Sequence, residues 1–162
     1  MIKLTNLLKE ILKRDNLNLG DKYISANDLS KKLEPNTEEI YDFGGGRFSP
    51  FKNNSVIIDA FDIPKDGNPD NKIHDLNQYI DLSSRNLINM SYSFYNFQYS
   101  PEIKKTVDNA LKSGGYLVVQ DYNNNLNKLK SIFKNYKILY ENINGGDPEE
   151  EDDGFYVIVF QK

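Results

Sequence analysis

The chain has 162 residues, 38% of them hydrophobic, and its 20 Lys and Arg against 24 Asp and Glu give a net charge of −4. This length predicts one domain with its own core, while the absence of Cys and the presence of a single His exclude disulfides, cysteine nucleophiles and zinc sites built from these residues. A negative net charge without a stripe of Lys or Arg argues against a nucleic-acid partner.

No membrane or export signal is visible in the sequence. The longest apolar runs are far shorter than the roughly 18 residues that a membrane span needs. Residues 1–14 have charges among their apolar positions and lack the cleavage site of a signal peptide. We therefore expect a soluble, cytoplasmic protein with no membrane contact.

Two helices are expected in an N-terminal helical segment over residues 1–35. Apolar side chains recur at helical spacing from Leu4 to Leu12, with lysines between them. Ser25 has the position of a cap for the second helix, and Pro35 ends that helix. These helices precede the part of the chain that carries the chemical motifs.

Strands and helices alternate over residues 38–161. Apolar runs bounded by turn residues predict the strands, and helical spacing predicts the helices, with Gly114-Gly115 expected to end the first helix. The predicted strands are residues 39–43, 55–59, 86–90, 116–120, 136–140 and 155–160, and the predicted helices are residues 101–111 and 126–133. No helix separates the last two strands, so they should be antiparallel. The expected fold is α/β: a Rossmann-like, mostly parallel sheet with an antiparallel C-terminal strand and helices on its faces.

A glycine triplet follows the first predicted strand, in the sequence Asp42-Phe-Gly-Gly-Gly46. Glycines at this place let backbone N–H groups approach an anionic or zwitterionic ligand, because no Cβ stands in the way. They could equally make a tight turn after a strand, with no ligand involved. Position favours binding, since ligands of such sheets lie beyond the carboxyl ends of the strands.

An acid ends the second predicted strand. The carboxylate of Asp59 could accept hydrogen bonds from both hydroxyls of a ribose, as the acid after the second strand does in nucleotide-binding sheets. Asp62, three residues further on, could do the same. The alternative for either residue is a loop acid that caps a turn or faces solvent.

The pattern resembles the class I S-adenosylmethionine-dependent methyltransferases over residues 38–161. The matching pieces are the glycine-rich turn at 41–46, the acid after the strand at 57–59, the acid in His74-Asp-Leu76 and the closing strand pair. The stretch 110–119, Ala-Leu-Lys-Ser-Gly-Gly-Tyr-Leu-Val-Val, is similar to the family's helix end and fifth strand. It is the most specific single match.

The resemblance implies a role for each matching residue. Asp42 and the glycines Gly44, Gly45 and Gly46 would hold the methionine part of S-adenosylmethionine. Asp59 would bind the ribose, Asp75 the adenine amino group, and Leu76 would cover the adenine face. Asn89, Tyr92 and Tyr95, at and after the third strand, would face the transferred methyl group and orient an acceptor rather than deprotonate it. The aromatic side chains of this cluster could instead be core residues.

Two connections depart from the family's pattern. Residues 47–54 contain Pro50 and are too few for the crossover helix that normally follows the glycine turn, and residues 64–71 are too rich in Pro, Gly and Asn for a second helix. One face of the sheet should therefore be partly open, unless the N-terminal helices or a second subunit of a homo-oligomer cover it. Asn89-Met-Ser-Tyr92 stands where base-amino methyltransferases have Asn/Asp-Pro-Pro-Tyr/Phe, which argues against DNA adenine or cytosine amino groups as acceptors.

Two functions from different classes fit these observations. The first is a methyltransferase that uses S-adenosylmethionine and acts on a small molecule or a protein side chain. The second is a catalytically inactive methyltransferase-like module for binding or assembly, which the shortened connections favour. Another nucleotide-binding α/β enzyme is a weaker third reading, because the triplet lacks the G-x-G-x-x-G spacing.

Overall fold

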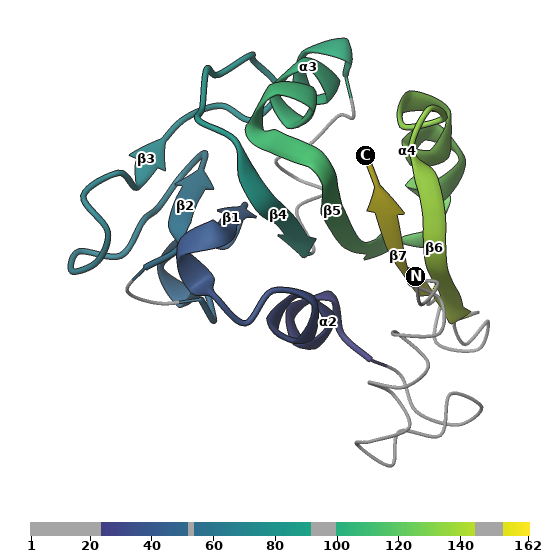
Figure 1. Ribbon diagram of the computed structural model, residues 1–162, viewed down its shortest axis with the longest axis horizontal. Helices are drawn as coiled ribbons and strands as arrows, with labels where there is room; N and C mark the ends of the chain where they lie inside the picture. The colour runs from purple at the N-terminus through teal and green to yellow at the C-terminus, as the bar shows by residue number, and fades with distance from the viewer. Residues whose placement is uncertain (1–23, 52–53, 92–99, 145–153) are drawn as a thin grey trace.

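In a computed structural model of the protein, the described residues are 24–51, 54–91, 100–144 and 154–162 (Figure 1). The expected helix at residues 4–12 lies outside these ranges, as do Tyr92 and Tyr95. The expected second helix is present as α2 (Ala26–Leu33). Ser25 caps it as predicted, since its hydroxyl accepts a hydrogen bond of 3.1 Å from the backbone N of Asp28.

Seven strands form one mixed sheet in the order β3-β2-β1-β4-β5-β7-β6. The strands are β1 (Ile40–Phe43), β2 (Val56–Asp59), β3 (Lys72–Ile73), β4 (Arg85–Ser91), β5 (Leu111–Tyr122), β6 (Lys137–Asn144) and β7 (Phe155–Gln161). The first five run parallel to one another, whereas β7 is antiparallel to both β5 and β6. The predicted Rossmann-like α/β sheet with an antiparallel C-terminal strand is therefore confirmed.

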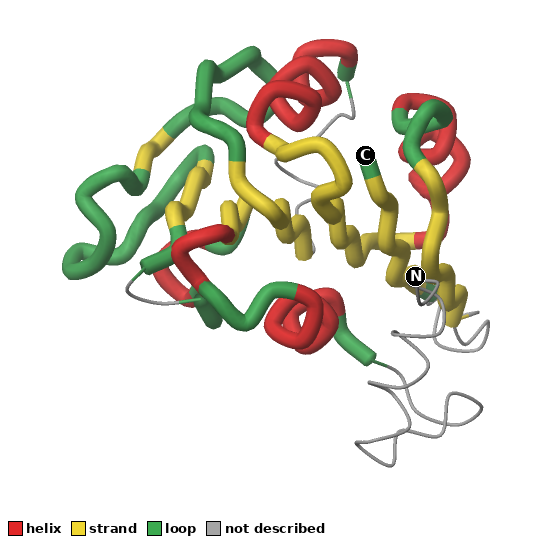
Figure 2. Tube along the Cα trace, in the orientation of Figure 1, coloured by secondary structure: helices red, strands yellow, loops and turns green. Residues whose placement is uncertain are grey.

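Helices cover both faces of the sheet. α2 lies on one side, and α3 (Pro101–Ala110) and α4 (Leu126–Ile132) lie on the other, as Figures 1 and 2 show. Each face has its own apolar cluster, because side chains alternate along the strands. The cluster on the α2 side includes Leu29, Ile40, Phe51, Leu87 and Val118. The cluster on the other side includes Phe43, Ile58, Met90, Ile103 and Phe133.

The alternation also places polar residues on the α2 side. Ile40 lies on this side, so Asp42, two residues on, points the same way. Asp42 is the register partner of Asn89 on β4, and of Ile57 on β2. Asp59, two residues after Ile57, therefore lies on the same side. The carboxyl ends of β1, β2 and β4 thus bring Asp42, Asp59 and Asn89 to one face of the sheet.

The structure agrees with one detail of the sequence prediction and modifies two others. No crossover helix follows the glycine turn in the described residues, as expected, and the turn leads into the short 3₁₀ helix Gly46–Phe48. β3 was not predicted, because two exposed residues carry no periodic pattern. The prediction that Gly114-Gly115 ends α3 was wrong: the helix ends at Ala110, and both glycines lie within the span of β5.

Candidate functional site

The glycine turn after β1 is built on left-handed backbone at two positions. Gly44 has φ of 80° and Gly46 has φ of 55°, a region that residues with a Cβ rarely adopt. The backbone N of Gly44 donates a hydrogen bond of 2.8 Å to the carbonyl O of Ile58 on β2. The turn is therefore fixed to the neighbouring strand and lies at the carboxyl end of the sheet.

Gly45 is required for a different reason, which is the close approach of a carboxylate. A Cβ added to Gly45 would stand 1.9 Å from Oδ2 of Asp42 and 2.5 Å from its Cγ. No side chain fits there unless Asp42 moves. The carboxyl group of Asp42 thus lies directly against the backbone of the turn.

Asp42 is enclosed by hydrogen bonds. The hydroxyl of Ser49 donates to Oδ2, and the amide Nδ2 of Asn89 donates to Oδ1 at 3.0 Å. Asn89 also donates to Oδ1 of Asn27 at 3.1 Å and accepts from the hydroxyl of Ser30 at 2.8 Å. This network joins β1 and β4 to α2, and leaves Asp42 only 1% exposed.

Burial changes the acidity of this carboxyl group. Desolvation raises the pKa of Asp42 from 3.8 to about 6, against the lowering effect of the bonds from Ser49 and Asn89. The nearby Asp59 carboxylate raises it further. Since the folded-state pKa exceeds the unfolded one, the folded protein holds a proton that the unfolded chain has released between about pH 4 and pH 6. This group therefore destabilises the fold as pH rises through that window.

Asp42→Asn should remove this pH dependence. The amide can still accept the bond from Asn89 and donate to the Ser49 hydroxyl, so the network survives without a titrating group. We expect the stability of the variant relative to the unsubstituted protein to increase by about 3 kcal/mol between pH 4 and pH 7. Denaturant unfolding at several pH values measures this difference, and a difference that stays constant with pH would contradict it.

Asp59 has one carboxylate oxygen in use and one without a partner. Oδ1 accepts hydrogen bonds from the backbone N of Phe61 at 2.8 Å and of Asp62 at 3.0 Å. Oδ2 makes no hydrogen bond to the described residues and lies 3.5 Å from the Cβ position of Gly46. The residue is 5% exposed. An unpartnered acceptor with little access to water therefore adjoins the glycine turn.

Asp62 differs from Asp59 because it already has an ionic partner. The Nε of Arg47 lies 3.0 Å from its Oδ2, and about half of the Asp62 side chain is exposed. This ion pair joins the segment after the glycine turn to the segment after β2. Each segment also exposes a phenyl ring, since Phe48 is 82% and Phe61 76% exposed. Each acid has one carboxylate oxygen without a hydrogen bond to the described residues, but Asp59 is 5% exposed and has no ion pair among them, whereas the side chain of Asp62 is half-exposed and paired with Arg47.

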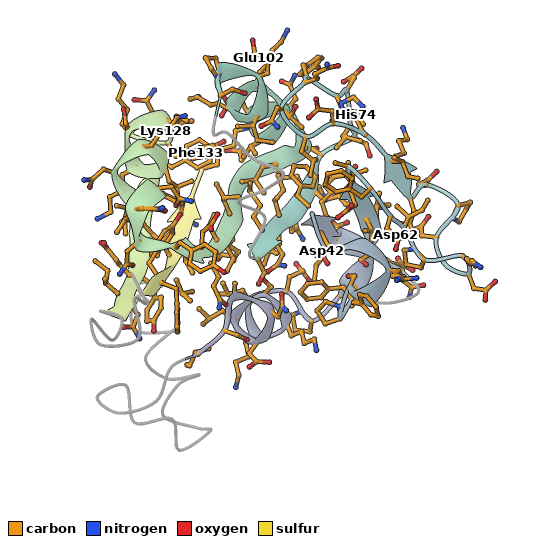
Figure 3. All side chains as sticks on the ribbon, turned by 180° about the vertical axis from the view of Figure 1, so that it is seen from behind. Asp42, Asp62, His74, Glu102, Lys128 and Phe133 are labelled. Atoms are coloured by element: carbon orange, nitrogen blue, oxygen red, sulfur yellow. The ribbon has the colours of Figure 1, made fainter. Side chains whose placement is uncertain are left out.

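The two residues expected near an adenine lie in different environments. Asp75 is exposed, and its Oδ1 accepts a hydrogen bond of 2.9 Å from the backbone N of Asn77. Leu76 is 0% exposed and belongs to the core cluster with Phe43 and Ile58. The expectation that Leu76 covers a ligand face is therefore corrected: its side chain packs inside the protein. Figure 3 places His74 toward α3, away from Asp42 and Asp62.

Asn89 also differs from its expected role at the transferred methyl group. It is 0% exposed, and both of its amide hydrogens and its carbonyl oxygen face protein partners. We correct it to a positioning residue for Asp42 and α2. Sequence reasoning missed its partners Asn27 and Ser30, and it missed Ser49, which donates to Asp42. One signal was available, because Asp42 and Asn89 are both the polar third residue of an apolar strand segment.

Solved structures provide matches, although no protein-family model and no curated protein matches the sequence. An S-adenosylmethionine-dependent methyltransferase from Mesorhizobium loti is 15% identical, with 85% of this chain and 98% of that chain covered and a TM-score of 0.59. The N-methyltransferase NodS from Bradyrhizobium japonicum, in complex with S-adenosyl-L-homocysteine, is 13% identical, with 98% and 97% covered and a TM-score of 0.55. The [4+2]-cyclase SpnF is 10% identical, with 84% and 80% covered and a TM-score of 0.58.

These similarities establish the fold. The chain has the fold of the class I S-adenosylmethionine-dependent methyltransferases, as the sequence motifs indicated. The cyclase among the similar structures has another activity, so the fold alone does not determine the reaction. Among the described helices, none is both long and apolar enough to cross a membrane.

Proposed function

We propose that the protein binds S-adenosylmethionine at the carboxyl ends of β1 and β2 and transfers its methyl group to a small-molecule or protein acceptor. The observation that carries this proposal is the Oδ2 of Asp59, which makes no hydrogen bond to the described residues and lies beside the Gly44–Gly46 turn in a residue that is 5% exposed. The fold supplies the context, since solved methyltransferases share it. The cytoplasm, where S-adenosylmethionine is available to enzymes, remains our expected location.

The residues present fit the cofactor at three points. Asp59 offers a carboxylate oxygen for the ribose hydroxyls, in a setting where a charge-assisted bond is stronger than in water. The glycine turn leaves room for the methionine part, because a Cβ at Gly46 would have nothing closer than 3.5 Å. Asp75 is exposed and can accept from an adenine amino group. Besides these three points, the segments after the glycine turn and after β2 each expose a phenyl ring, Phe48 and Phe61, that is available as apolar cover.

Asp42 and Asn89 would act indirectly. Asp42 is held by Ser49 and Asn89 against the backbone of the turn, so it shapes the turn rather than contacting a ligand. A carboxylate behind the turn also favours a positive charge nearby, such as the amino group or sulfonium of the cofactor. Asn89 keeps the Asp42 carboxyl oriented and joins it to α2.

The chemistry needs little from the protein beyond alignment. S-adenosylmethionine supplies an activated methyl group, and a nucleophilic acceptor held at near-attack distance needs no strong base. Tyr92 and Tyr95, which follow β4 in the sequence, are our proposed acceptor-orienting residues. A single domain with the methyl acceptor as its partner, and no nucleic acid, is the organisation we propose.

A second function is favoured by one observation. The glycine turn leads into a 3₁₀ helix of three residues, so the described part of this connection has no long helix that presents its N-terminus to the ligand. Weakened cofactor binding would leave a methyltransferase-like module for binding or assembly. This alternative predicts a folded protein without measurable affinity for the cofactor.

Calorimetric titration with S-adenosylmethionine and S-adenosyl-L-homocysteine separates the two functions. We expect both sulfur ligands to bind with micromolar affinity, of the order of −8 kcal/mol, and NAD and ATP to bind far more weakly. Selective binding of the sulfur ligands would justify a search for acceptors. Absence of binding, in protein whose cooperative unfolding shows that it is folded, would refute the methyltransferase proposal and favour the module.

A further inference from the structure

A cavity of about 380 Å³ lies beside β2, on a different part of the strand from the candidate site. It is lined by Arg47, Ser55, Ile57, Pro64, Lys65, Asp66, Gly67 and Asn71. Ile57 lies in the middle of β2 and Ser55 precedes it, so the cavity adjoins the first half of the strand rather than its carboxyl end. The volume is within the range of small-ligand sites.

The absence of a crossover helix explains why this surface is open. In a doubly wound sheet, the helix between β1 and β2 packs over these strands. Here the connection is short, and its described part forms only the 3₁₀ helix Gly46–Phe48. The α2-side face of β2 at Ile57 is therefore walled by loop residues of the 64–71 segment, which carry polar and charged groups.

Asn71 has a fixed orientation in this cavity. Its Oδ1 accepts a hydrogen bond of 2.8 Å from the backbone N of Ile57, which determines which end of the amide is the donor. The Nδ2 group lies 3.2 Å from the Cβ position of Gly67 and makes no hydrogen bond to the residues that the structure describes. The cavity wall thus contains a donor group whose direction is set by the sheet.

Two cations add further donor capacity. Arg47 uses its Nε for Asp62, and its guanidinium lies over the Phe48 ring at 5.0 Å from the ring centroid, but its two Nη groups make no hydrogen bond to the described residues. Lys65 is exposed and has no ion pair within the described part of the chain. Asp66 is the one carboxylate in the lining. The groups available to a ligand are therefore mainly hydrogen-bond donors. Two cationic side chains and one amide NH₂ group can donate, and one carboxylate can accept.

We propose that this cavity binds a small organic anion, a carboxylate or phosphate that carries an apolar group. The charged end would lie against Lys65, the Nη groups of Arg47 and the Nδ2 of Asn71, and the apolar part against Ile57 and Pro64. Because Arg47 directly follows Gly46, an anion held here would also contact the segment that ends the glycine turn. The proposal does not depend on methyl transfer, since none of its residues contributes a ligand to the cofactor site.

Nuclear magnetic resonance titration of the full chain tests the proposal. The probes are phenyl phosphate, benzoate and inorganic phosphate at constant ionic strength, with the amide signals of Gly67 and Asn71 as reporters. We expect saturable shifts with phenyl phosphate or benzoate, and weaker binding of inorganic phosphate, which lacks the apolar part. The better of the two organic probes identifies the anionic group. No saturable shift with either would overturn the proposal.

Substitutions then locate the site. Lys65→Gln should weaken binding about fivefold, because it removes the charge pair that Lys65 would form with the bound anion at the protein surface. Asn71→Asp keeps the acceptor for Ile57 but replaces the donor by a negative charge, so it should weaken binding by about tenfold or more. Lys128→Gln on α4 is the matched control, since Figure 3 shows Lys128 at the other end of the sheet from Asp62. Equal affinity in all three variants would overturn the assignment.

Asp66→Asn distinguishes an anion from a zwitterion. If the ligand is an anion, removal of this carboxylate should tighten binding about threefold, because like-charge repulsion disappears. Weaker binding would show that Asp66 contacts a cationic group, and the proposal of a simple anion would be wrong. Asp59→Asn should leave probe binding unchanged, so failure of this site and failure of the cofactor site are separable.

Discussion

Asp59→Asn is expected to lower the affinity for S-adenosylmethionine by about 30-fold, because one charge-assisted bond at a buried site contributes about 2 kcal/mol. The substitution is chosen to preserve the turn. The Oδ1 of an Asn can still accept the two backbone bonds from Phe61 and Asp62, while Nδ2 replaces the unpartnered oxygen that we assign to the ribose. Calorimetry measures the loss directly.

The matched control is Asp62→Asn. This substitution breaks the exposed ion pair with Arg47, and exposed pairs contribute little, so affinity should stay within about threefold of the unsubstituted protein. Unfolding curves of both variants verify that each remains folded. Equal losses in the two variants, or no loss in Asp59→Asn, would remove Asp59 from the site.

Most of the sheet could be predicted from the sequence because its strands are short apolar runs bounded by Gly, Pro and polar residues. The antiparallel final pair followed from the lack of a predicted helix between its strands, whereas β1 and β2 are parallel although their connection is too short for a crossover helix. β3 could not be predicted, since Lys72 and Ile73 are both exposed and form a strand only through pairing with β2. The local pattern of apolar and polar residues contains no information on such a pairing between distant segments.

The candidate site was predictable in position but not in detail. Residues after parallel strands must meet at one edge, which is why Asp42 and Asp59 could be placed together. The environment of each side chain depends on contacts between distant residues. Asn89 is buried because Ser30, 59 residues earlier, donates to it, and no spacing in the sequence predicts that contact. Leu76 is in the core for a similar reason, since its neighbours there come from other strands.

Gly45→Ala is expected to destabilise the protein by about 3 kcal/mol, the range observed when a buried hydrogen-bonded group is displaced. The backbone of Gly45 is in the right-handed region, with φ of −72°, so Ala causes no conformational strain. The cost arises from space, because the new Cβ would stand 1.9 Å from Oδ2 of Asp42. Moving the carboxyl group breaks its bonds to Ser49 and Asn89. Denaturant unfolding measures the loss.

A second substitution identifies the Asp42 contact as the cause. In Asp42→Ala the carboxyl group is absent, so adding Gly45→Ala should cost less than it does alone, with a coupling of about 1–2 kcal/mol in the double-mutant cycle. Gly67→Ala is the control for glycine substitution, because Gly67 is exposed and its nearest neighbour would be the Asn71 amide at 3.2 Å. It should change stability by less than about 1 kcal/mol. Equal stabilities of Gly45→Ala and Gly67→Ala would contradict the prediction. They would show that the turn tolerates a side chain at position 45 and that its shape does not depend on the contact with Asp42.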